Sequence, residues 1–243
     1  MIETRQLHKK FGKKVAVDDI SFAAPDGAVT AILGPNGAGK TTSLRMVYGL
    51  IRPDCGAALV DGHDAAREPR RVREQLGVLP DSPGLYGRLT AREHLRYAGE
   101  LQGLGGARLD AAVDRLIELL DMEEIAGRRS AGFSQGERRK TALGRALVHD
   151  PQNVVLDEPT NGLDVMSSRA MRRLVRRLAE DGKCVVLSSH VMPEVAAVAD
   201  RVVVIAGGRV AADATPSEIL ASTGKDDLED AFVRLIGSEE GLN

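Results

Sequence analysis

The sequence predicts an α/β fold: a mostly parallel sheet covered by helices, with an antiparallel β subdomain near the N-terminus and an inserted α-helical subdomain. Short aliphatic strands recur along the chain, each bounded by turn residues or an acid. They cover residues 28–33, 154–156, 184–187 and 201–205. Aromatic residues make up only 3% of the 243 residues and tryptophan is absent, so aliphatic side chains must supply the core. Aliphatic strands of this kind are typical of parallel sheets buried on both faces.

Amphipathic helices are expected between these strands. Apolar residues recur at i, i+3, i+4 and i+7, which places them on one face of a helix. Two sets follow this spacing: Val113, Leu116, Ile117 and Leu120, and Met171, Leu174, Val175 and Leu178. The alternation of strands with helices supports the α/β prediction.

Three segments depart from this alternation. Residues 15–22 have the pattern of an antiparallel strand, residues from about 81 to 130 are mainly helical, and Gly207-Gly208 marks a hairpin followed by two short helices. We therefore expect one domain with three parts. These are a core of residues 1–80 and 151–220, a helical subdomain of residues 81–150, and a C-terminal helical tail of residues 221–243.

Composition excludes several classes of protein. The chain has 33 basic and 35 acidic residues, a formal net charge of -2, which argues against a general polyanion binder. No apolar stretch approaches the roughly 18 to 20 residues that cross a bilayer, and the first residues lack a secretory signal, so we expect a cytoplasmic chain. Cys55 and Cys184 are far apart in sequence and are expected to be small buried hydrophobic residues.

A phosphate-binding loop is predicted between the first parallel strand and the next helix. The segment matches G-x-x-x-x-G-K-[ST], and glycines let the backbone wrap around phosphate oxygens at a helix N-terminus. Lys40 adds a positive charge for the β and γ phosphates, and the Thr41 hydroxyl suits Mg²⁺. A glycine-rich turn with an incidental lysine would not need the flanking strand and helix. The predicted nucleotide-binding residues are Gly34, Pro35, Asn36, Gly37, Ala38, Gly39, Lys40, Thr41 and Thr42.

Three polar residues follow later strands of the same predicted sheet. Asp157 and Glu158 end the apolar strand at 154–156, which we take to be central, and His190 follows the strand at 184–187. Ligands bind at the carboxyl ends of parallel strands. Asp157 is therefore expected to hold Mg²⁺, and Glu158 to polarise the attacking water as general base. The other four histidines are expected to be structural.

The chain resembles the ATP-binding cassette (ABC) family across essentially its whole length. Residues 133–137, Phe-Ser-Gln-Gly-Glu, are similar to the family's L-S-G-G-Q signature segment and keep its serine and second glycine. Residues 156–164, Leu-Asp-Glu-Pro-Thr-Asn-Gly-Leu-Asp, are similar to its Walker B strand, catalytic glutamate and D-loop in continuous register. The resemblance implies a P-loop ABC ATPase core, with His190 as a second catalytic residue at the switch histidine and Ser134 and Gly136 contacting ATP.

Two further positions are compared with the family pattern. Phe11 is placed like the aromatic residue that stacks on adenine, with packing in the core as the alternative. Asp81 stands where the family's Q-loop has a glutamine near Mg²⁺ and the attacking water. Because aspartate is shorter and negatively charged, it would bind the metal more tightly or fail to reach it.

The signature segment implies that a complete site needs two chains. Ser134 and Gly136, with the N-terminus of the helix after them, form a second anion site that one chain does not need. In the family, the signature of one subunit closes on the P-loop of the other around two ATP molecules. The expected partner is therefore a second copy or another ABC ATPase subunit.

The resemblance also implies a separate integral membrane permease, which would hold the chain at the inner face of the cell membrane. The expected contacts are the helical subdomain and residues 81–95. The alternative is a soluble ABC ATPase that acts on nucleic acid or ribosomes. The interval from Lys40 to Ser134 has no room for the long coiled coil of DNA-repair cassettes, and only one cassette is present. A P-loop kinase or GTPase would leave the signature and D-loop segments unexplained, and we expect no nucleic-acid partner.

The direction of transport and the transported cargo are inferred from a weaker resemblance to particular ABC subfamilies. Residues 79–90 resemble exporter cassettes of the ABC-2 type, and with residues 228–235 they look most like NatA-type sodium-extrusion ATPases. Because the permease selects the cargo, export of a drug, a lipid or a polysaccharide stays open beside sodium.

Overall fold

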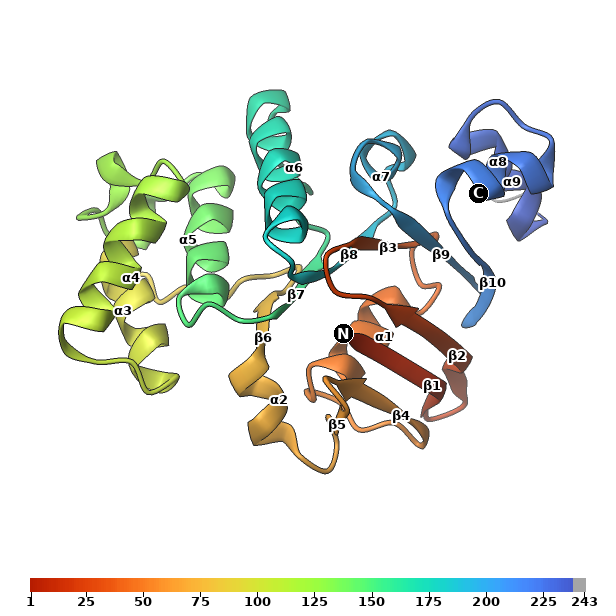
Figure 1. Ribbon diagram of the computed structural model, residues 1–243, viewed down its shortest axis with the longest axis horizontal. Coiled ribbons are helices and arrows are strands. Elements are labelled where there is room, and N and C mark those ends of the chain that lie inside the picture. Colours follow the sequence, from red (N-terminus) through yellow and green to blue (C-terminus); the bar gives the residue numbers. More distant parts are fainter. Residues whose placement is uncertain (238–243) are drawn as a thin grey trace.

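The computed structural model describes residues 1–237, which form a six-stranded sheet beside a four-stranded antiparallel sheet (Figure 1). The strand order of the larger sheet is β10-β9-β3-β8-β7-β6. Neighbouring strands from β9 through β6 pair in parallel, and β10 pairs antiparallel with β9. The strands are β3 (Val29–Leu33), β6 (Leu76–Leu79), β7 (Asn153–Asp157), β8 (Cys184–Ser189), β9 (Arg201–Ala206) and β10 (Arg209–Ala214). The predicted mostly parallel sheet is confirmed, but β7 lies next to the edge strand β6 rather than at the centre.

The smaller sheet has the order β2-β1-β4-β5. Its strands are β1 (Ile2–Phe11), β2 (Lys14–Ala24), β4 (Cys55–Val60) and β5 (His63–Asp64). β2 contains the antiparallel strand predicted at 15–22, whereas β1 was not predicted. Phe11 therefore ends a strand, at the β1–β2 hairpin, instead of preceding the first strands.

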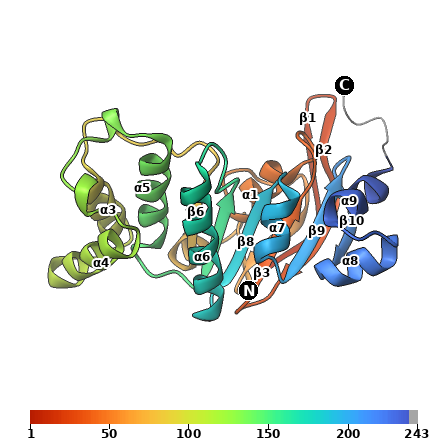
Figure 2. The same cartoon turned by 90° about the horizontal axis from the view of Figure 1, so that it is seen from above.

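Two layers of helices cover the larger sheet (Figures 1 and 2). α1 (Lys40–Val47) lies between the two sheets, while α6 (Val165–Glu180) and α7 (Met192–Val198) cover the opposite face. α2 (Pro69–Gln75) leads into β6. α1 ends at Val47, because the chain turns at Gly49, which has a positive φ of 68°.

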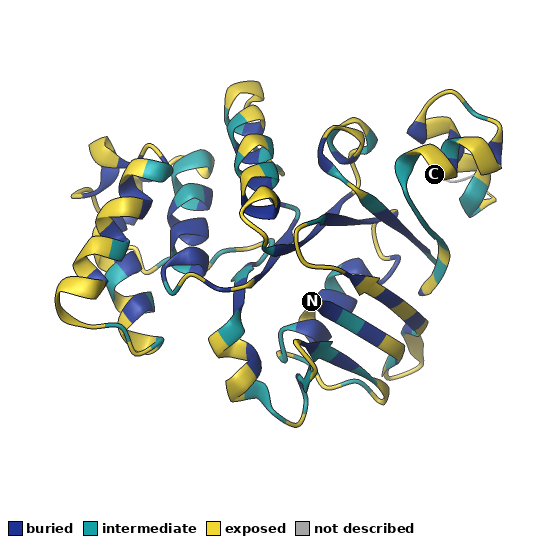
Figure 3. Ribbon diagram, in the orientation of Figure 1, coloured by how far each residue is buried: buried dark blue, intermediate teal, exposed yellow. Residues whose placement is uncertain are grey.

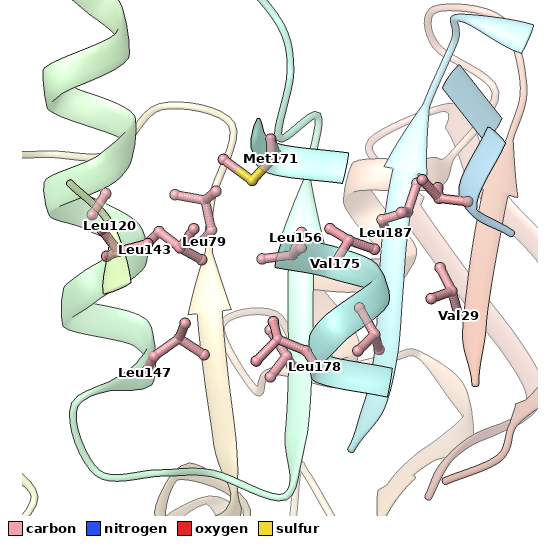
Figure 4. Packing of buried hydrophobic residues seen from close by; sticks show 14 of the residues in the cluster. Val29, Leu79, Leu120, Leu143, Leu147, Leu156, Met171, Val175, Leu178 and Leu187 are labelled. Carbon is pink, nitrogen blue, oxygen red and sulfur yellow. The ribbon is translucent and has the colours of Figure 1, made fainter. Parts of the chain in front are cut away.

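Alternating side chains of the larger sheet fill two separate cores. On one face Val29, Leu156 and Leu187 pack against Val175 and Leu178 of α6, as Figure 4 shows. On the other face Ile32, Val155 and Val186 pack with α1 and the smaller sheet. Side chains of a strand point alternately to the two faces of the sheet, and both faces are covered here. β3, β7 and β8 are therefore buried along their whole length (Figure 3).

The inserted helices are α3 (Ala91–Leu101), α4 (Gly106–Leu119) and α5 (Gln135–Leu147), with short 3₁₀ turns at Glu123–Ile125 and Ser130–Gly132. α5 packs closely on α3, since a Cβ atom on Gly144 would lie 2.9 Å from Leu95 Cδ1. α5 begins at Gln135, because Ser134 caps its first turn.

The C-terminal segment contains α8 (Pro216–Thr223) and α9 (Leu228–Ile236). Residues 238–243 of the predicted helical tail lie outside the described residues. Cys184 is buried as predicted, but the prediction for Cys55 was wrong. Cys55 is exposed because it is the first residue of β4, in which burial begins only at Ala58. No helix within residues 1–237 is both long enough and apolar enough to span a bilayer.

Candidate active site

The loop between β3 and α1 is shaped by its glycines. Gly39 precedes α1 with a φ of 110°, and a Cβ atom there would lie 2.6 Å from the carbonyl oxygen of Ala16. Gly37 also has a positive φ, of 80°. Both conformations favour glycine, and together they wrap the loop around the N-terminus of α1. No side chain within residues 1–237 caps that end of α1, so its backbone N–H groups can bind an anion.

Lys40 is the first residue of α1 and is only 5% exposed. Its Nζ donates to the carbonyl oxygens of Gly34, at 2.6 Å, and Pro35, at 3.3 Å. The same Nζ lies 3.6 Å from Oε1 of Glu158. The ammonium group is therefore held at the loop by acceptors that a phosphate oxygen could replace.

A cavity of about 520 Å³ opens at this loop, a size that suits a nucleotide. It brings together most of the residues predicted from sequence. Of the predicted loop residues, Gly34 and Ala38 are buried and do not line the cavity. The lining residues are Phe11, Lys14, Ala16, Pro35, Asn36, Gly37, Gly39, Lys40, Thr41, Thr42, Asp81, Glu158, Asn161 and His190.

Asp157 ends β7 and is 1% exposed. Its Oδ1 accepts hydrogen bonds from the Thr41 hydroxyl at 3.2 Å and the Ser188 hydroxyl at 2.6 Å. Its Oδ2 is buried and has no hydrogen-bond partner among residues 1–237. Burial raises the pKa of Asp157, and the Ser188 and Thr41 hydroxyls oppose that shift. A buried carboxylate oxygen without a partner, beside a threonine hydroxyl, fits a hard divalent cation.

Asp157 and Thr41 would be only part of a metal site. The described residues contain no group of three or more His, Cys, Asp or Glu side chains that could hold a metal ion. A cation here would therefore need oxygens from phosphate or water besides those of the protein, as Mg²⁺ does in nucleotide sites.

Glu158 adopts a left-handed backbone conformation, with a φ of 51°. For a residue with a Cβ atom this conformation costs about 1 to 2 kcal/mol, and such strain is concentrated at functional sites. The Glu158 N–H donates to the Ser188 hydroxyl at 3.0 Å. Its Oε2 lies 2.9 Å from Nδ1 of His190, which follows β8. The structure thus brings together the two residues predicted to be catalytic.

Phe11 and Asp81 lie at the rim of the cavity. Phe11 is 49% exposed, so its ring is available to a ligand, and the ammonium of Lys9 lies 5.7 Å from the ring centroid. Asp81 follows β6, and its side chain is 45% exposed. Both line the same cavity as the phosphate-binding loop.

Sequence reasoning missed five residues at this site. Lys14, Ala16 and Asn161 line the cavity, while Ser188 and Arg139 form hydrogen bonds to residues at its wall. Ser188 and Asn161 belong to segments that were singled out, since they lie beside His190 and in the Asp157–Asp164 stretch. Position along those segments could have identified them. Arg139 carries no comparable signal, because its partners are backbone carbonyl oxygens.

The predicted signature residues lie elsewhere. Ser134 and Gly136 line a separate cavity of about 630 Å³, and none of the described residues lines both cavities. Ser134 caps α5 in a capping box: its hydroxyl accepts from the Glu137 N–H at 3.2 Å, and its own N–H donates to the Glu137 carboxylate at 2.7 Å. The Ser134 N–H and the nearby Arg128 lower the pKa of Glu137.

Residues 17–161 match the ABC transporter family. The chain belongs to the ABC transporter family. It is 42% identical over 224 residues to the ABC transporter ATP-binding protein NatA of Bacillus subtilis, and the match covers 91% of each chain. It is 38% identical over 221 residues to the Nod factor export ATP-binding protein I of Paraburkholderia xenovorans, covering 91% of this chain and 73% of that protein.

A solved structure of an ATP-binding subunit of an ABC transporter has the same fold. Its TM-score is 0.89 at 29% identity, with 97% of this chain and 99% of that chain covered. As a member of the ABC family, the chain is an ATP-binding and ATP-hydrolysing subunit of a transporter. The predicted fold class, family and ATPase function are confirmed.

Proposed function

We propose that two ABC subunits close around two ATP molecules and use their hydrolysis to drive a separate membrane permease. One observation carries this proposal: the phosphate-binding loop and the signature residues of one chain line different cavities. Ser134 and Gly136 therefore do not reach the nucleotide cavity of their own chain. The two residues would instead complete the nucleotide site of a partner, which is a second copy or another ABC ATPase subunit.

Within each site, the residues have distinct roles. The Phe11 ring stacks on adenine, and the loop N–H groups and Lys40 bind the phosphates. Glu158 accepts a proton from water as the water oxygen attacks the γ-phosphorus and the bond to the ADP oxygen breaks. His190 orients the Glu158 carboxylate through their 2.9 Å contact. When Lys40 turns to phosphate, its 3.6 Å contact with Glu158 is lost, and the carboxylate is free to act as base.

We propose that Thr41, Asp157 and Asp81 hold Mg²⁺ together with ATP. The support is the unpartnered Oδ2 of Asp157 within residues 1–237 and its contact with the Thr41 hydroxyl. Bound Mg²⁺ supplies positive charge that stabilises the phosphates during transfer.

The permease is proposed to dock in an apolar groove of about 270 Å³ between β6, α3 and α5. Leu101, on its rim, is 71% exposed, and Ala98, Ala142 and Pro83 line its wall. Pro80 also lines the groove and precedes Asp81, so permease motion at the groove would reach the nucleotide cavity. This contact would place the chain at the inner face of the cell membrane.

Export is the proposed direction. The ABC-2 type segment at residues 79–90 supports it, as does the name of the Nod factor export relative. Sodium is the proposed cargo, and this choice rests on resemblance alone. Sodium efflux from vesicles containing this chain and its permease tests the proposal, and transport of a drug, lipid or polysaccharide instead would overturn it.

Co-purification tests the function as a whole. The chain should be recovered from detergent extracts with a membrane protein, and that protein should stimulate its ATPase activity. The variant Leu101→Glu should lose this association and keep ATP binding, whereas Leu50→Glu, at another exposed apolar position that does not line the groove, should not. Stimulation by nucleic acid without any membrane partner would contradict the proposal.

A further inference from the structure

Arg139 is a buried charge that the roles above do not use. It lies on α5, five residues after the signature serine, and is only 4% exposed. Burial lowers the pKa of its guanidinium, and the negative charges of Asp81, Glu158 and Asp157 oppose that shift. Its Nη1 is buried without a partner among the residues that the structure describes. Burying a charged guanidinium away from water costs free energy unless the contacts of its other nitrogens offset that cost.

Those contacts join three segments. The Nε donates to the carbonyl oxygen of Asn161 at 3.0 Å, and Nη2 donates to the carbonyl oxygen of Asp81 at 3.4 Å. Nη2 also lies 3.9 Å from the Asp81 carboxylate. Asn161 and Asp81 both line the nucleotide cavity, whereas Arg139 belongs to the helix capped by Ser134.

The planar guanidinium suits this task, because its donors are fixed in direction and can hold two loops at once. It also brings a positive charge beside Asp81, where the family has a neutral glutamine. A lysine at this position would keep the charge but would lose the fixed pair of donors. The two contributions, backbone positioning and charge compensation, can therefore be separated by substitution.

We infer that Arg139 is a positioning residue for ATP hydrolysis: it ties the signature helix to the Asp81 and Asn161 loops and offsets the negative charge of Asp81. Binding of a partner's nucleotide at Ser134 would thus be transmitted along α5 to the wall of the chain's own nucleotide cavity. The inference rests on the nucleotide site proposed above, but not on the permease.

The test compares Arg139→Met, Arg139→Lys and the matched control Arg138→Met in the full chain. Arg138 is the neighbouring arginine, and its Nε donates within its own segment, to the carbonyl oxygen of Phe133. Arg139→Met should lower kcat about tenfold and change the KM for ATP less than about twofold, since the phosphate-binding loop is intact. Arg139→Lys should recover part of this loss, and Arg138→Met should stay within about twofold of the parent.

A second readout does not depend on turnover. Amide hydrogen exchange should become faster at residues 81–84 and 159–163 in Arg139→Met, and not in Arg138→Met. In an Asp81→Gln background, removing Arg139 should cost less than about threefold in kcat, because the charge to be offset is gone and only the backbone contacts are lost. Unchanged kcat and unchanged exchange in Arg139→Met would overturn the inference. So would an equal loss in both backgrounds. Failure of ATP binding in the parent chain would instead refute the nucleotide site.

Discussion

Nδ1 of His190 lies 2.9 Å from Oε2 of Glu158, although the two residues are separated by α6 and a strand. They meet because β7 and β8 are parallel neighbours, with Asp157 paired to Ser188, so that Glu158 and His190 follow the two strands at the same edge of the sheet. The contact fixes the carboxylate of a glutamate that is already held in a left-handed backbone conformation. The pair forms because both residues lie at the same edge of the sheet, although they are distant in sequence.

Replacing Glu158 with glutamine should separate ATP binding from hydrolysis. The amide keeps the size of the carboxylate but cannot accept the proton from water, so turnover should fall by about a hundredfold or more while ATP still binds. Size-exclusion chromatography with ATP should then show a stable dimer. Near-normal turnover in Glu158→Gln would remove Glu158 from the role of base.

Lys40→Ala should abolish ATP binding. The Lys40 ammonium is the charged group at the loop. It donates to the Gly34 carbonyl oxygen at 2.6 Å, and a phosphate oxygen can replace that acceptor. Equilibrium binding of a fluorescent ATP analogue measures the loss, which should exceed about a hundredfold. Lys13→Ala changes a lysine outside the cavity lining and should bind normally. An alanine variant at Lys40 that binds ATP tightly would contradict the loop assignment.

Phe11→Ala should weaken ATP binding about two- to thirteenfold, and Phe11→Tyr should restore it, because a stacked aromatic ring contributes about 0.5 to 1.5 kcal/mol. The ring is half exposed, so the melting temperature should change little. Titration with ATP and with inorganic triphosphate distinguishes the causes. If triphosphate binding falls as much as ATP binding, the ring does not contact the base.

Much of the site is predictable because its parts are local in sequence. The phosphate-binding loop needs glycines at fixed spacing, and Gly39 shows why: its φ of 110° and the nearby Ala16 carbonyl leave no room for a side chain. Asp157, Glu158 and His190 are predictable because each follows an apolar strand, and parallel strands end at one edge.

The features that were missed depend on distant partners. β1 has polar residues at 8–10 and an interrupted register near Gln6, whose φ is 48°, so it lacks a clean alternation of apolar residues. Arg139 was missed because carbonyl oxygens, its acceptors, are present at every residue. The exposure of Cys55 depends on where the burial of β4 begins. None of these follows from composition or spacing alone.

Ser134→Ala should destabilise the fold and also impair hydrolysis. Loss of the cap on α5 should lower the free energy of unfolding by about 1 kcal/mol. Thr215→Ala removes the same type of capping box from α8, whose residues line neither cavity, and serves as the matched control. Both variants should lose similar stability in urea unfolding, but only Ser134→Ala should lose ATPase activity. Equal activities would mean that Ser134 is a cap and nothing more.

The fold should become less stable in mild acid because His94 is buried in its neutral form. The ring is 1% exposed; the Tyr86 N–H donates to its Nε2 at 2.9 Å, and Nδ1 lies 2.8 Å from the Thr90 carbonyl oxygen. Since a backbone N–H can only donate, Nε2 must be unprotonated and Nδ1 carries the proton. Burial lowers the pKa of His94 from its ordinary value of 6.5, and Arg145 lowers it further, against the Thr90 hydrogen bond and Glu93.

The unfolded chain therefore takes up the proton on His94 at a higher pH than the folded chain does. The free energy of unfolding should fall as the pH drops below about 6.5, until the folded pKa is reached. Urea unfolding from pH 8 to pH 5 measures this slope. His94→Gln should flatten it, whereas His149→Gln should leave the His94 part in place, since burial lowers the pKa of His149 independently. An unchanged slope in His94→Gln would show that His94 is not the group responsible.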